Sequence, residues 1–262
     1  MKRGTLAACL VALLCAAVLA TAMWRDNPLT IRAQVYAQSI ATTAAATYVT
    51  LRTLNAFLST AQELEVGLGF IASGSAQPLK VLEPIDDTIE RIAGLVFGVM
   101  VATGILAVAL GPVSAVGFAM LALALLLWLI TARRSRGLPR RLAWYGGFLG
   151  LALPLALVAS SGLAERMTDT TYRANLAVIA DITAKLDAEQ IDGQAGGFDL
   201  SITRIDEYRQ LAINVWNRAD ELINSLVTIL AVYVFRIFIL PLLLMGGLFV
   251  IARHFARNDA RD

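Results

Sequence analysis

The chain has 262 residues, of which 58% are hydrophobic and 16% are charged, and its formal net charge is +2. Soluble domains carry about 25% charged residues, so this composition excludes an ordinary soluble domain and is typical of a membrane protein. The two cysteines, Cys9 and Cys15, both lie near the amino terminus, which excludes a disulfide framework or a cysteine zinc site elsewhere in the chain.

Five long apolar stretches, bordered by charged residues, follow one another along the chain. Each is near the ~20 residues that a helix needs to cross ~30 Å of hydrocarbon. They comprise residues 6–23, 92–110, 113–130, 142–163 and 222–252. The sequence therefore predicts an all-α, multi-pass membrane protein with four to five transmembrane helices and two helical extracytoplasmic regions.

Residues 1–23 contain the first apolar stretch and have two interpretations. Lys2 and Arg3 precede the apolar run, and Ala20-Thr21-Ala22 after it resembles a cleavage site of a secretory signal. The run is slightly long for a signal, so we favour an uncleaved membrane anchor. Under both interpretations the chain emerges outside the membrane at residue 24.

Residues 24–91 form the first predicted outer region, with five basic and seven acidic residues. Seven small or apolar residues recur there with alternating four- and three-residue steps, which predicts one apolar stripe on a helix. They are Ile40, Ala44, Thr47, Leu51, Leu54, Leu58 and Ala61. Gly67 and Gly69 are expected to end this helix, and Asp86 and Asp87 to begin the next, because carboxylates are favourable at a helix amino terminus.

Residues 92–131 contain two apolar stretches separated by Gly111-Pro112, and they create a conflict in topology. Two crossings would place the basic loop that follows on the outer side, against the rule that basic residues stay inside. One resolution is a single crossing with a hydrophobic hairpin, and another is a single broken, tilted span. In the third, the charge rule fails and the second acidic region is cytoplasmic. We favour a net single crossing.

Residues 132–141 form a short loop with five arginines and no acid. These are Arg133, Arg134, Arg136, Arg140 and Arg141. Because basic residues beside membrane spans mark the cytoplasmic side, we expect this loop inside, together with the amino terminus and the carboxyl tail. Anionic lipid headgroups are its expected partners, and nucleic acid is not.

The chain then crosses again at residues 142–163 and enters a second outer region, residues 164–222, with six basic and eleven acidic residues. The stripe Leu176, Ile179, Thr183 and Leu186 predicts a helix, followed by a glycine-rich loop over residues 191–198. Asp199 or Ser201 is expected to cap a further helix with the stripe Ile205, Tyr208, Ala212, Val215, Ala219 and Leu222. We expect that helix to continue unbroken into the last span.

The two halves of the chain share a basic start, a span, an acidic helical region and a returning span. This plan suggests a parallel two-part pseudo-repeat, although few residues are identical between the halves. Short stripes of this kind usually mean packing of helices within one molecule, with a coiled coil as the less common alternative.

Residues 223–262 contain the last span and a short cytoplasmic tail, and Arg236 interrupts this apolar stretch. A charge in the membrane core costs roughly 2.5–3.5 kcal/mol, which makes Arg236 the candidate functional residue within the membrane. The alternative interpretation gives Arg236 a structural role: if the span begins at Ile237, its side chain reaches the outer membrane interface. Asp220 and Glu221 lie too far along the same helix to pair with it directly.

No catalytic, cofactor-binding or metal-binding motif is present, and paired carboxylates such as Glu63 with Glu65 are typical of solvated faces. We therefore predict a non-catalytic protein of a bacterial inner membrane. It would act as an interaction, assembly or accessory subunit through its outer helical regions, with membrane lipids and a membrane or periplasmic protein, or a second copy, as partners. The alternative is a transporter or channel component with Arg236 and the proline-kinked spans lining a path.

Overall fold

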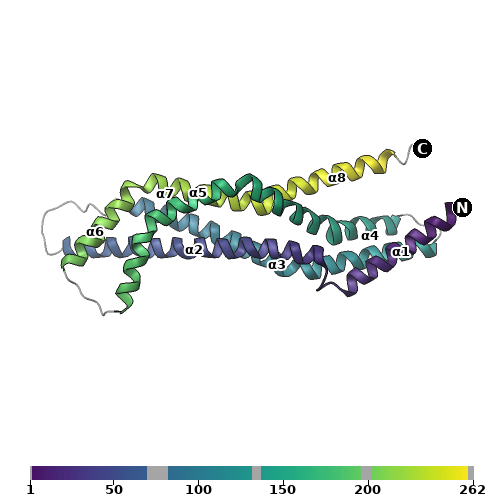
Figure 1. Cartoon of the computed structure of the whole chain (residues 1–262), viewed down its shortest axis with the longest axis horizontal. Coiled ribbons are helices and arrows are strands. Elements are labelled where there is room, and N and C mark those ends of the chain that lie inside the picture. The colour runs from purple at the N-terminus through teal and green to yellow at the C-terminus, as the bar shows by residue number, and fades with distance from the viewer. Residues whose placement is uncertain (1, 70–81, 132–136, 196–201, 259–262) are drawn as a thin grey trace. The chain divides into compact units, whose positions relative to one another are not determined.

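The computed structural model describes residues 2–69, 82–131, 137–195 and 202–258. These ranges contain helices and no strand, which confirms the all-α class (Figure 1). The elements are α1 (Lys2–Ala22), α2 (Pro28–Gly69), α3 (Glu83–Thr131), α4 (Gly137–Gly147), η2 (Phe148–Ala152), α5 (Leu153–Ala195), α6 (Ile202–Asn217), α7 (Ala219–Val234), η3 (Phe235–Ile239) and α8 (Leu240–Asn258). The two η elements are single π-helical turns.

The start of α2 follows from its first residues. The side-chain oxygen of Asn27 accepts a hydrogen bond from the backbone N–H of Leu29 at 3.1 Å, which caps the helix. Pro28 occupies the first helical position, where its missing N–H costs nothing. The helix then continues for 42 residues and ends at Gly69, within the glycine pair predicted to end it.

Helix α3 is continuous for 49 residues and contains Pro112 in its interior. It begins at Glu83, with Glu83 and Asp86 in its first turn, as the acidic residues predicted. The expected hairpin over residues 92–131 is wrong, because no turn interrupts the helix at Gly111-Pro112 (Figure 1). Both apolar stretches on either side of Pro112 therefore belong to one helix.

The chain divides into two compact units. Unit 1 comprises residues 1–41, 101–166 and 235–262, and unit 2 comprises residues 42–100 and 167–234. By sequence, unit 1 holds 14 basic and four acidic residues, a net charge of +10, whereas unit 2 holds eight basic and 16 acidic residues, a net charge of −8. The small net charge of the whole chain thus hides two strongly and oppositely charged parts.

In unit 1, α3 packs against both α2 and the α4–η2 segment. Thr30 of α2 donates a hydrogen bond to Ser114 of α3 at 3.2 Å, and Ser114 donates one to the carbonyl of Gly150 at 3.3 Å. The rings of Trp144 on α4 and Phe249 on α8 lie 5.9 Å apart.

The core of unit 1 consists mainly of small residues. Ala33, Ala37 and Ala156 are fully buried, and Thr30 and Ser114 are almost so. Small side chains let helix backbones approach closely, so packing here depends on short interhelical distances rather than on large apolar side chains.

The closest approach in unit 1 joins α3 to the end of α4 and η2 through three glycines. A Cβ atom built on Gly117 would overlap the backbone of Gly150, and one on Gly146 would lie 2.7 Å from the carbonyl oxygen of Gly117. Gly146 and Gly150 form a G-x-x-x-G pair, a spacing typical of helices that pack backbone to backbone.

Unit 2 has a different core, made of large aliphatic residues. Leu51, Leu54 and Leu58 of α2 are at most 1% exposed, and Ile89 of α3 and Leu222 of α7 are fully buried. Helices α2 and α3 are antiparallel here, since Ser59 donates a hydrogen bond to Asp86 and the rings of Tyr48 and Phe97 lie 5.4 Å apart. Unit 2 therefore resembles the bundle core of a water-soluble protein.

The predicted stripe on α2 is confirmed at all seven positions, each of which is buried: Ile40, Ala44, Thr47, Leu51, Leu54, Leu58 and Ala61. On α5, Ile179 and Thr183 are buried as predicted, but Leu176 is 40% exposed and is not part of the core. Ala212, Val215, Ala219 and Leu222 are buried as predicted. The side chains of Leu186, Ile205 and Tyr208, and the cap candidates Asp199 and Ser201, lie outside the described residues.

The helix expected to run unbroken into the last span is interrupted. It ends at Asn217, and α7 begins at Ala219 after the single non-helical residue Arg218. Backbone hydrogen bonds of helical spacing still cross this residue, from the Arg218 N–H to the Asn214 carbonyl at 3.2 Å and from the Leu222 N–H to the Arg218 carbonyl at 2.9 Å.

Three helical segments of the described chain are long and apolar enough to cross a membrane. They are Glu83–Ile130, Gly137–Ala184 and Ala219–Ile251, and Ala8–Ala22 is a shorter apolar helix. Apolar side chains are also distributed unevenly: 31 of the 39 exposed large hydrophobic side chains described belong to unit 1.

The glycine contact gives a testable expectation. Gly117→Ala should destabilise the protein by about 1–3 kcal/mol or more, because the new methyl group forces α3 away from the backbone of η2. Gly147→Ala is the matched control, because its Cβ would meet nothing within 4 Å and alanine favours the helix. Thermal unfolding of both purified variants in detergent measures the difference, and equal stabilities would contradict the backbone contact.

Candidate functional site

Arg236, the residue singled out by its position in the last apolar stretch, lies in the π-helical turn η3. Its side chain is partly buried. Glu221 pairs with Arg218, and the side chain of Asp220 is exposed.

The backbone of Arg236 makes a contact that explains the π turn. Pro241 follows η3 and has no N–H, so the carbonyl five residues earlier, that of Arg236, receives no hydrogen bond at the π-helical spacing. Tyr36 of α2 donates its phenol hydrogen to this carbonyl oxygen at 3.0 Å. A side chain from another helix thus satisfies the acceptor that the proline leaves free.

Burial raises the pKa of the Tyr36 phenol to about 12, and the positive charge of Arg236 opposes this rise. The phenol therefore keeps its proton at any physiological pH and remains a hydrogen-bond donor. The Tyr36–Arg236 contact is a permanent link between α2 and η3 rather than one that titrates.

The second π turn, η2, also precedes a Leu-Pro pair, but its hydroxyl-bonded carbonyl lies four rather than five residues before the proline. Pro154 follows η2 and has no N–H, so the carbonyl of Gly150, four residues earlier, receives no α-helical hydrogen bond. Ser114 of α3 donates to that oxygen at 3.3 Å, and Thr30 of α2 donates in turn to Ser114. In both turns a Leu-Pro pair follows the π segment and a buried or partly buried hydroxyl takes the free carbonyl.

Unit 2 contains a separate polar group centred on Tyr233 of α7, which is 1% exposed. Its hydroxyl lies 2.8 Å from the hydroxyl of Thr47 on α2 and 3.3 Å from that of Tyr172 on α5. These contacts join three helices and satisfy a phenol that would otherwise be buried without a hydrogen bond. They support a structural role for Tyr233.

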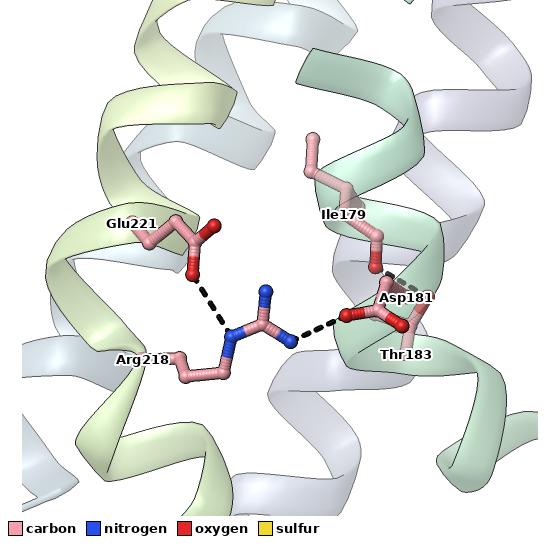
Figure 2. Close-up of polar contacts among 5 residues, drawn as sticks. All are labelled: Ile179, Asp181, Thr183, Arg218 and Glu221. Carbon is pink, nitrogen blue, oxygen red and sulfur yellow. Dashed lines mark hydrogen bonds and ion pairs between the residues drawn. The ribbon is translucent and has the colours of Figure 1, made fainter. Parts of the chain in front are cut away.

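Arg218 links the α6–α7 junction to α5, as Figure 2 shows. Its Nη1 atom lies 2.6 Å from Asp181 and its Nε atom 2.9 Å from Glu221. These two hydrogen bonds raise the pKa of the Arg218 guanidinium, Glu221 contributing most. Because all three side chains are partly or largely exposed, this group fixes geometry at the junction more than it adds stability.

The other residues singled out from the sequence do not lie together in one site. Arg140 and Arg141 lie exposed on α4, whereas Arg133, Arg134 and Arg136 lie outside the described residues. Cys9 and Cys15 are free and exposed on α1. Among the described residues, no group of three or more histidine, cysteine or acidic side chains could hold a metal ion.

Sequence reasoning missed Tyr36, Ser114 and Thr30, which contact the π turns. A signal was present, because each Leu-Pro pair within an apolar helix predicts free carbonyls that need partners. The sequence alone does not show which hydroxyls reach them. Chemically, the described groups are hydroxyls, carbonyls and arginines, which can bind and orient but do not form a general acid–base pair.

Comparison with known proteins identifies no relative: no protein-family model, no curated protein and no solved structure matches this chain.

A double-mutant cycle tests the proline explanation. Tyr36→Phe should cost about 1–3 kcal/mol of stability, because it leaves the Arg236 carbonyl without its donor. In a Pro241→Ala background the same change should cost less, because the restored N–H lets the helix satisfy its own carbonyl. Thermal unfolding in detergent measures the stability of the wild type, the two single variants and the double variant. Tyr145→Phe, at an exposed tyrosine, is the control. If the losses of stability from Tyr36→Phe and Pro241→Ala simply add in the double variant, the explanation is contradicted.

Proposed function

We propose that this protein is a non-catalytic integral membrane protein whose unit 1 contains the membrane-spanning segments and whose acidic unit 2 is an interaction module outside the bilayer. The observation that carries the proposal is the unequal exposure of apolar side chains, 31 of 39 on unit 1. Large exposed apolar surfaces are stable in lipid but not in water. The small-residue core of unit 1 and the large-residue core of unit 2 agree with this assignment.

The charges define the boundaries of the proposed membrane layer. No charged residue occurs between Arg3 and Arg25, between Arg141 and Glu165, or between Arg236 and Arg253. At 1.5 Å per residue, these intervals correspond to helices of about 26–36 Å, close to the ~30 Å hydrocarbon thickness. Three of the four membrane segments thus carry charges at both borders.

Helix α3 has no such outer border, since it is uncharged from Ile92 to Ala132. At ~60 Å this run is about twice the bilayer thickness, so only part of it can be immersed. Trp24 contacts Gly111: a Cβ on that glycine would lie 3.0 Å from the indole ring. Tryptophan favours the membrane interface, so we place the outer boundary on α3 near Gly111, with residues 113–130 in the bilayer and residues 92–110 beyond it.

The alternative boundary, with residues 92–110 immersed, is disfavoured by α5. It continues from η2, where the Gly150 carbonyl accepts a hydrogen bond from Ser114 and Gly150 lies against Gly117, and it runs antiparallel to α3, so Glu165 and Arg166 lie roughly level with Val101. Both side chains are exposed. Immersing them would cost roughly 2.5–3.5 kcal/mol each even on lenient insertion scales, in addition to Arg236.

The proposed topology has four crossings: α1, the second half of α3, α4–η2 with the start of α5, and η3 with α8. The amino terminus, the arginine loop and the carboxyl tail then share one side, which is cytoplasmic by the charge rule. For a bacterial inner membrane, unit 2 is periplasmic. Its partner is a membrane or periplasmic protein, and Arg236 is an interfacial arginine.

The alternative is a transporter or channel component. It is favoured by the two π turns, because π turns occur frequently at functional sites and Arg236 lies in one of them. Against it, the proline-freed carbonyls that would line a path are already bonded to Ser114 and Tyr36.

Cysteine accessibility tests the topology. In a Cys9→Ala, Cys15→Ala background, a membrane-impermeant maleimide should label Val49→Cys and Ile213→Cys from the outer side, because both side chains are exposed on unit 2. Leu138→Cys, exposed at the start of α4, should react only in inverted vesicles. Labelling of Val49→Cys and Ile213→Cys from opposite sides would contradict four crossings.

Site-specific photocrosslinking in cells tests the interaction role. A photoreactive amino acid at Trp216 or Ile213, both 43% exposed on α6, should give discrete protein adducts. The same probe at Leu243 on α8, which is 62% exposed in unit 1, should give no protein adduct, because lipid surrounds it. Two results together would favour the transporter instead. These are the absence of adducts at both unit 2 positions, and a flux through liposomes that is lost when Arg236 is substituted.

A further inference from the structure

Helix α4 and the start of η2 present one exposed face that changes from basic to aromatic to apolar along the chain. Arg140 and Arg141 are exposed near the start of α4, and Trp144 and Tyr145, which are 42% and 66% exposed, follow one turn later. Phe148, the first residue of η2, is 48% exposed and lies a further turn along. Steps of three and four residues place all five side chains in one sector of the helix.

The opposite face of α4 is fixed against α3. Pro139 and Gly146 are buried on that face. A Cβ atom on Gly146 would lie 2.7 Å from both the carbonyl oxygen of Gly117 and the backbone nitrogen of Leu121. Backbones this close leave no room for α4 to rotate about its axis, so the exposed face keeps its direction.

The two arginines of this face have no acidic counterpart near them. Neither forms an ion pair with a side chain in the part of the chain that the structure describes. No aspartate or glutamate occurs in the sequence from Val101 to Ala164. Two adjacent guanidinium groups without an acidic neighbour favour a phosphate, because each offers N–H donors in the geometry that phosphate oxygens accept.

Under the proposed topology, this face lies at the cytoplasmic border of the bilayer. By the helical rise, Trp144 and Tyr145 lie about 5–6 Å beyond Arg141 toward the hydrocarbon, and Phe148 lies about 10 Å beyond it. Tryptophan and tyrosine favour the interfacial layer, so the aromatic pair is at the depth of the lipid backbone. Phe148 is then at the depth where the acyl chains begin.

We propose that this face of α4 binds an anionic phospholipid, with the phosphate on Arg140 and Arg141 and an acyl chain against Phe148. The inference rests on the proposed placement of unit 1 in the bilayer. Phe249 of α8 adds a second contact surface, because it is 55% exposed and its ring lies 5.9 Å from that of Trp144.

The order of the side chains favours a lipid over a soluble anion or an acidic protein. A phospholipid has a charged headgroup, an interfacial glycerol layer and apolar chains, in the same sequence as the basic, aromatic and apolar residues of this face. A soluble phosphate would use only the arginines. An anionic headgroup is favoured over a zwitterionic one, whose own positive group would lie near two guanidinium groups.

Fluorescence quenching by brominated lipids tests the site in the full-length chain. With the other three tryptophans changed by Trp24→Phe, Trp128→Phe and Trp216→Phe, Trp144 is the only reporter. The protein is placed in phosphatidylcholine vesicles that contain a minor fraction of chain-brominated phosphatidylglycerol or of chain-brominated phosphatidylcholine. Quenching by the brominated phosphatidylglycerol should be several-fold stronger, because the site concentrates the anionic lipid beside Trp144.

Arg140→Gln combined with Arg141→Gln should make the quenching by the two brominated lipids equal. Arg32→Gln combined with Arg166→Gln is the matched control. It also removes two exposed arginines from unit 1, but on the proposed outer side, and should leave the difference unchanged. Circular dichroism checks that each variant retains its helices.

Equal quenching by the two lipids before the arginines are changed would overturn the proposal, and so would a preference that survives the loss of Arg140 and Arg141. Glycerophosphoglycerol, the headgroup without chains, should not remove the preference at constant salt; if it does, the occupant is a soluble anion. Quenching by neither lipid would contradict the membrane placement itself, so the two failures are distinguishable.

A second measurement keeps all four tryptophans. In detergent, added phosphatidylglycerol should raise the unfolding temperature of the unsubstituted protein more than phosphatidylcholine does, because a ligand of the folded state stabilises it. The difference should disappear in the Arg140→Gln, Arg141→Gln variant. An equal rise with both lipids in the unsubstituted protein would overturn the site.

Discussion

The continuity of α3 is the constraint on which the rest of the proposed arrangement depends. A helix crosses the hydrocarbon with about 20 residues, and α3 has twice that number without a charge or a turn. An unbroken helix cannot return to the side from which it started, so its two ends lie on opposite sides of any membrane that it crosses. This places the arginine loop opposite Glu83 and removes the conflict between the apolar stretches and the charge rule.

Helix α2 passes through both units, and the size of its buried residues differs between them. Helix α2 is buried through Ala33 and Ala37 in unit 1 and through Leu51 and Leu54 in unit 2. In lipid, apolar side chains gain little by leaving the solvent, so association depends on close backbone packing through alanine, serine and glycine. In water, burial of large aliphatic side chains is the main driving force. The large buried side chains of α2 in unit 2 agree with the proposed placement of that unit in water.

The sequence predicted the helical class and the buried stripe from Ile40 to Ala61, because helical periodicity is a local property of the chain. It left a hairpin and a single broken span open at Gly111-Pro112, and the structure has one continuous helix through Pro112 there. The stripe also began earlier than predicted, at Thr30, because small residues carry a weak hydrophobic signal. Pairings such as Tyr36 with Arg236 join residues 200 positions apart, and no local pattern contains them.

The prolines account for most of what distinguishes Arg236. Its sequence position suggested a functional charge in the membrane, and the structure shows in addition that its backbone carbonyl accepts a hydrogen bond from Tyr36. Gly150 has no side chain, and its carbonyl is taken by a hydroxyl in the same way before Pro154. The arrangement therefore does not require an arginine at position 236. Under the proposed membrane placement, Arg236 lies at the interface, where a long basic side chain is favourable.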